Sequence, residues 1–128
     1  MAIQTRTAPG TSSDGAVLTK ALIRAADRLD VSQKVLASVI GVSEAVVSRM
    51  RSGTFVLDRN AGKAFELAAL FVRLYRSLDA IVGGDETVAK AWMRNPNTVL
   101  RQPPIDIIQK VQGLLEVLHY LDARRAPV

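Results

Sequence analysis

Apolar side chains recur along this chain at spacings of three and four residues, which is the period of an amphipathic helix. The pattern predicts one helix from Val17 to Leu29 and a longer one, of roughly six turns, over Ala61 to Val82. No stretch keeps the period-two alternation of a β-strand. The hydrophobic pattern therefore predicts an all-α fold.

Serine and glycine mark the ends of two short helices between these segments. Ser32 suits the N-cap of a helix over residues 33–40, and Gly41 can take the positive φ that ends it. Ser43 in the same way suits the cap of a helix from residue 44 to about residue 52, which Gly53 ends. The sequence thus predicts two consecutive short helices joined by a tight turn.

Three shorter helical segments are predicted after Val82. Asp85 suits the cap of a helix that reaches Trp92, and Pro104 suits the first position of a further helical turn. A last helix is expected from about Gly113 to Ala123. These segments and the helix over 61–82 have the composition of a packed helical unit, which we place at residues 61–128.

The first residues have a different composition. From Thr5 to Gly15 the chain is rich in Thr, Ser, Gly and Pro, so it buries too little apolar surface to offset the entropy lost on ordering. We expect a disordered tail over residues 1–16, with the first helix capped near Gly15. A first folded unit would then occupy residues 17–60.

The charged residues are unevenly distributed along the 128-residue chain. Of its net charge of +5, residues 17–63 contribute eight basic against four acidic side chains, and residues 64–128 contribute eight against seven. A basic first half suggests nucleic acid as its partner. The absence of cysteine excludes disulfides and thiolate chemistry, and nothing resembles a signal peptide or membrane span. We expect a cytoplasmic protein without a membrane partner.

The two short helices meet the requirements of a helix-turn-helix. Such a motif needs a small residue where the helices cross, a glycine in the turn, and apolar residues that fix the crossing angle. Here these are Leu36, Ala37, Ile40, Gly41, Val42, Val47 and Met50. With Gln33, Ser43, Ser48, Arg49 and Gly53, the stretch resembles the Xre or phage-repressor type of helix-turn-helix.

The second helix of this motif would enter the major groove. Arg49 can make a bidentate contact to guanine, Glu44 can accept from cytosine N4, and the Ala45 methyl can meet that of thymine. Arg51 lies nearer the core and suits a phosphate, and Ser43 suits a cap better than a base contact. The full set of expected DNA-binding residues is Gln33, Ser43, Glu44, Ala45, Ser48, Arg49 and Arg51.

The second half resembles the C-terminal domain of the Xre/MbcA/ParS-like antitoxins. The resemblance rests on Trp92-Met93, Pro96-Asn97, Leu100, Pro104, Ile107-Ile108, Gly113, Val117 and Leu121. The chain departs from the family where Met93 replaces the usual Leu and where Gln102-Pro103 stands in place of a common Gly. The resemblance implies a type II antitoxin that blocks the active site of a RES-domain toxin, which destroys NAD, and represses their shared operon.

In that family the end of the chain reaches toward the toxin's catalytic cleft. This implies toxin contacts by Asp122, Arg124, Arg125 and Val128. The two arginines also suit the negative end of a helix dipole, so a structural role stays open for them. We further expect a homodimer on a palindromic operator, because a helix-turn-helix dimer reads two half-sites.

Enzymatic function is not supported by the sequence. His119 is the one histidine and has no cysteine or evident carboxylate partner, and we expect neither a cofactor nor a metal. The alternative to an antitoxin is a stand-alone dimeric repressor of the Xre family, whose second half would serve only to dimerise.

Overall fold

The computed structural model describes residues 3–125, with side chains placed from residue 14 onward. The helices are α1 (Ile3–Arg28), α2 (Gln33–Ile40), α3 (Glu44–Ser52), the 3-10 helix η1 (Arg59–Ala61), α4 (Lys63–Ile81), α5 (Glu86–Arg94), α6 (Pro104–Ile107) and α7 (Val111–Arg125). Residues 3–125 contain no strand, which confirms the predicted all-α class.

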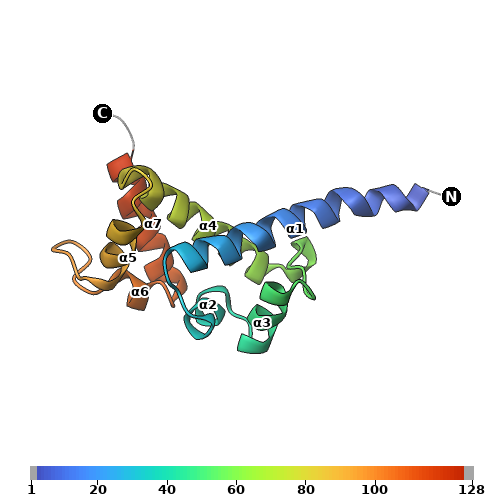
Figure 1. Cartoon of the computed structure of the whole chain (residues 1–128), viewed down its shortest axis with the longest axis horizontal. Coiled ribbons are helices and arrows are strands. Elements are labelled where there is room, and N and C mark those ends of the chain that lie inside the picture. Colours follow the sequence, from blue (N-terminus) through green and yellow to red (C-terminus); the bar gives the residue numbers. More distant parts are fainter. Residues whose placement is uncertain (1–2, 126–128) are drawn as a thin grey trace.

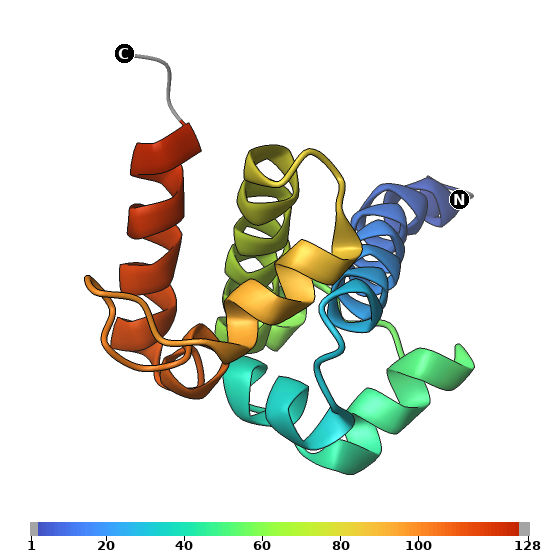
Figure 2. The same cartoon turned by 60° about the vertical axis from the view of Figure 1, so that its left-hand side comes forward.

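Helix α4 lies at the centre of the molecule and is shared by both halves. It contacts α1 and α2 on the side of the helix-turn-helix and α5 and α7 on the other, as Figures 1 and 2 show. Its buried residues include Leu67, Phe71, Leu74 and Leu78, which recur at the spacing of a helical stripe. The long apolar helix expected over 61–82 is therefore the core helix of a single chain.

The two short helices end where the sequence predicts. The Ser32 hydroxyl accepts from the Val35 N–H at 3.2 Å, and that of Ser43 accepts from Val46 at the same distance. Gly41 (φ 75°) follows α2 and Gly53 (φ 84°) follows α3, both in the left-handed conformation. These local caps determine where the two helices of the helix-turn-helix begin and end.

Helix α1 begins at Ile3, so residues 3–16 are helical although a disordered tail was expected there, and residues 1–2 of that expected tail lie outside the described residues. Gly15 is not a helix cap but an interior residue, whose carbonyl accepts from the Thr19 hydroxyl at 2.7 Å. A Cβ at Gly15 would lie 3.0 Å from the Leu57 carbonyl oxygen, so the glycine allows the loop between α3 and η1 to approach α1. Once formed, the helix extends with one backbone hydrogen bond for each residue added.

Helix α7 also begins earlier than predicted, at Val111 rather than Gly113. Gly113 lies inside its first turn, where an added Cβ would meet the Ile107 carbonyl oxygen at 1.8 Å. The glycine thus lets α6 pass directly against α7. Pro104 is the first residue of α6, as the sequence predicts. No helix in the described part of the chain is long and apolar enough to cross a bilayer.

Arg94, at the end of α5, links the two halves. Its guanidinium donates to the Leu29 carbonyl at 3.0 Å and also to the Asp30 carbonyl, where the chain leaves α1. A cation at the C-terminal end of a helix is favoured by the helix dipole. The ends of α1 and α5 are therefore held together by charge as well as by the shared core.

Candidate nucleic-acid interface and C-terminal surface

The outer side of α3 is exposed, and four of its exposed residues form what we call the reading face: Glu44, Ala45, Ser48 and Arg49. On the opposite side, Val47 and Met50 are buried in the core. This is the division expected from winding residues 44–52 at the helical period. The reading face is thus free to meet another molecule while the same helix stays packed.

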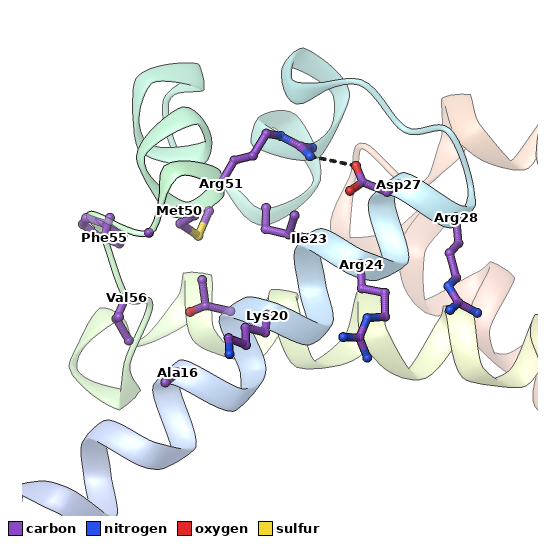
Figure 3. Close-up of a pocket in the computed structure, with 12 residues that line it drawn as sticks. Ala16, Lys20, Ile23, Arg24, Asp27, Arg28, Met50, Arg51, Phe55 and Val56 are labelled. Carbon is purple, nitrogen blue, oxygen red and sulfur yellow. Dashed lines mark hydrogen bonds and ion pairs between the residues drawn. The ribbon is translucent and has the colours of Figure 1, made fainter.

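Arg49 and Arg51 differ in their surroundings. The Arg49 guanidinium makes no hydrogen bond or ion pair with any residue whose side chain is described. The Arg51 guanidinium donates to the Asp27 carboxylate at 2.8 Å, an ion pair drawn in Figure 3. Asp27 lies 24 residues away and was not predicted from sequence. Arg51 would have to leave or share this carboxylate to contact phosphate.

Gln33 and Ser43 stand at helix N-termini. Gln33 is the first residue of α2 and is half-buried, next to backbone N–H groups that the helix itself leaves unpaired. Such an N-terminus favours a phosphate. The Ser43 hydroxyl oxygen accepts from the Val46 N–H, which confirms the capping role that we preferred over a base contact.

A groove of about 590 Å³ runs between α1 and the end of α3. Figure 3 shows Lys20 and Arg24 projecting from α1 beside it, with Met50 and Phe55 among its apolar lining residues. Nearby, a hydrogen bond from Arg28 to the Tyr75 hydroxyl (3.4 Å) helps to raise the pKa of the Arg28 guanidinium, which stays charged. These cations add to the positive field that attracts a polyanion.

Asp122 holds α7 against α4. Its carboxylate accepts from the Ser77 hydroxyl at 2.8 Å and from the Arg73 guanidinium, and Arg125 donates to the Ser77 oxygen at 3.2 Å. Ser77 is fully buried, so its hydroxyl needs these partners. Asp122, which the resemblance assigned to toxin contact, is thus engaged within the chain, through residues that were not predicted from sequence.

Arg124 lies on a different side of α7. Its guanidinium sits over the Tyr120 ring, 4.7 Å from the ring centroid, and Tyr120 in turn stacks on Trp92 of α5. Tyr120 was not among the predicted contact residues, although a tyrosine four residues before an arginine on a helix is a recognisable cation–π pair. Val128 lies outside the described residues.

Comparison with known families assigns both halves. Residues 9–73 match the antitoxin Xre-like helix-turn-helix domain, and residues 77–126 match the antitoxin Xre/MbcA/ParS C-terminal toxin-binding domain. The matches divide the chain within α4, whereas the sequence pattern suggested a division at 60/61. No curated protein matches the chain.

These families are not enzymes, in agreement with the prediction from sequence. The match to a toxin-binding domain favours the antitoxin over a stand-alone repressor. Because the helix-turn-helix match alone covers half of the chain, the protein belongs to the Xre-like helix-turn-helix antitoxins and is a type II antitoxin with DNA-binding and toxin-binding domains.

Proposed function

We propose that this antitoxin represses its own operon by binding a palindromic operator as a homodimer, and that it neutralises a RES-domain toxin by blocking the site that degrades NAD. The observation that carries the proposal is the combination, in one chain, of an exposed reading face with a toxin-binding domain. The identity of the toxin rests on the family resemblance of residues 92–121.

On DNA, the reading face would lie in the major groove. Arg49 would read guanine and Glu44 would read cytosine, while Ala45 and Ser48 would contact neighbouring bases. The N-terminus of α2 at Gln33 would bind a phosphate and set the orientation of the motif. Ser43 would act through its cap, and Arg51 would add a phosphate contact at the expense of its Asp27 ion pair.

A dimer would have to use surface outside the α4 core stripe, because α1 and α7 already cover that stripe. Phe65, Ala69 and Leu70 line a hollow of about 610 Å³ on another side of α4. Phe65 and Leu70 are only half-buried, so a second copy could cover apolar surface there. This supports α4 as the dimer contact that two operator half-sites require.

Replacing Arg49 tests the DNA-binding mode. Arg49→Ala should weaken operator binding by about 1–3 kcal/mol, because it removes a bidentate contact to a base edge. Arg49→Lys should lose most of this binding energy if Arg49 contacts guanine, because lysine cannot reproduce the bidentate geometry, but it should lose little if Arg49 contacts phosphate. Binding would be measured at fixed salt by fluorescence anisotropy, with a footprint of the wild-type complex.

Two protected half-sites about one DNA turn apart are expected in the footprint. Unchanged operator affinity in Arg49→Ala, with an unchanged melting temperature, would mean that another surface reads the operator. A single protected half-site would contradict the dimer.

Shortening the chain tests toxin neutralisation. Removal of Ala123 to Val128 deletes Arg124, Arg125 and Val128, the three predicted toxin contacts that lie beyond Asp122. Cells that co-express the toxin with the shortened chain should lose NAD faster than cells with the full chain. Operator binding should persist, because the reading face is far from this end of the molecule (Figure 1).

The operator measurement is the control for folding of the shortened chain. Equal NAD levels with the two chains would show that inhibition does not run through these residues. NAD levels that the toxin never lowers would exclude an NAD-degrading toxin.

A further inference from the structure

Trp92, Tyr120 and Arg124 form a continuous stack across α5 and α7. The Trp92 and Tyr120 rings are stacked, with centroids 6.2 Å apart and an interplanar angle of 21°. On α7, the Arg124 guanidinium covers the Tyr120 ring at 4.7 Å. Val88, one turn before Trp92 on α5, extends this surface and is 48% exposed. We call these four residues the stacked patch.

The stacked patch is accessible and incompletely paired. Both aromatic residues are only partly buried, although they pack against the core. Arg124 is exposed, and no carboxylate among the described side chains lies within ion-pair distance of it. One side of its guanidinium is thus taken by the Tyr120 ring, and its hydrogen-bond donors remain for another molecule.

The composition and rigidity of the patch suit a protein interface. Tryptophan, tyrosine and arginine are the residue types whose truncation to alanine most often causes a large loss of binding energy at protein interfaces. Stacking holds all three side chains in place in the free protein, so little rotamer entropy remains to be lost on binding. The Asp122–Ser77 contact holds the helix that carries Tyr120 and Arg124 against α4.

We propose that the stacked patch is the surface on which the toxin docks, with an apolar toxin side chain covering Val88 and Trp92 and a toxin carboxylate meeting Arg124. The inference rests on the proposed function, because it takes the co-encoded toxin as the partner. All four residues lie within residues 77–126, the part that matches a toxin-binding domain.

The charge of the patch argues against a second copy as the occupant. The patch carries a cation and no carboxylate, so two copies related by a two-fold axis would bring like charges together without a counter-charge. A toxin surface with an exposed Asp or Glu beside an apolar side chain is complementary to it.

Two pairs of matched variants test the proposal. Val88→Glu is compared with Val111→Glu, because the two valines are 48% and 49% exposed and both belong to the toxin-binding domain. Arg124→Glu is compared with Lys110→Glu, a similar charge reversal at an exposed residue that directly precedes the first residue of α7. Each full-length variant is titrated calorimetrically into a catalytically inactive form of the toxin encoded beside this antitoxin.

Val88→Glu and Arg124→Glu should weaken toxin binding about 30-fold or more, the range of hot-spot residues, while the two controls stay within about threefold of the wild type. Operator binding serves as the check on folding, and Arg124→Ala replaces any variant that fails it. Equal affinity of patch and control variants would overturn the assignment. So would loss of dimer in the patch variants with toxin affinity unchanged, which would place a second copy there.

The wild-type titration separates the proposal from the function on which it rests. If wild-type protein does not bind the co-encoded toxin at all, the proposed partner is wrong and the assignment of the patch falls with it. If wild-type protein binds and the patch variants bind equally well, only the patch is wrong.

Discussion

Gly113→Ala should lower the free energy of unfolding by about 3 kcal/mol, the upper part of the range for overpacked sites. An added Cβ would lie 1.8 Å from the Ile107 carbonyl oxygen, so α6 and α7 would have to separate. Helix propensity acts in the opposite direction, since alanine in place of glycine is worth at most about 1 kcal/mol. The clash is the larger effect, and toxin binding should be lost with the packing.

Gln112→Ala is the control for this variant. Gln112 is exposed and adjacent on α7, so its replacement should change the free energy of unfolding by less than about 0.5 kcal/mol. Urea denaturation monitored by circular dichroism measures both variants. A more stable Gly113→Ala protein would show that α6 does not pass against α7 at this residue.

Phe71→Ala should destabilise the whole chain by about 3–5 kcal/mol, as is usual when a buried phenylalanine is truncated. Phe71 is fully buried on α4, the helix that contacts both α1 and α7. The cavity therefore lies in the core that both halves share. Operator and toxin affinity should fall together at temperatures where the variant is partly unfolded, and one unfolding transition should shift as a unit.

Phe65→Ala is the matched control on the same helix. The Phe65 ring is half-buried and stacks under the Arg59 guanidinium at 5.5 Å, so its loss should cost the monomer about 1 kcal/mol. Because Phe65 also lines the proposed dimer contact, both variants are compared at a concentration too low for dimerisation. Two separate thermal transitions, of which Phe71→Ala moves only one, would contradict a shared core.

Features encoded by neighbouring residues were predicted correctly. The caps at Ser32 and Ser43, and the glycines after α2 and α3, act on groups within five residues of themselves. The spacing of the apolar residues in α4 likewise indicates directly which side of the helix is buried. For this reason the helix-turn-helix and its exposed reading face follow from the amino-acid sequence alone.

Features that depend on distant partners could not be predicted. The Asp122 carboxylate accepts a hydrogen bond from Arg73, which lies 49 residues earlier in the chain. Arg51 donates to Asp27, which lies 24 residues earlier. Neither pair follows from local spacing. Gly15 and Gly113 were interpreted as starts of helices, yet both lie within helices where another backbone passes close by. A sequence does not distinguish a glycine that ends a helix from one that makes room for a neighbour.

The position of α4 and the link from Arg94 to the end of α1 have a consequence for how the protein is removed from the cell. Because the buried residues of both halves form one core cluster that includes α4, a protease that captures the chain with α4 unfolded should destroy both binding activities in one event. The half-life of DNA binding and that of toxin binding should therefore be the same. Loss of a single molecule would end its DNA binding and its toxin binding at the same time.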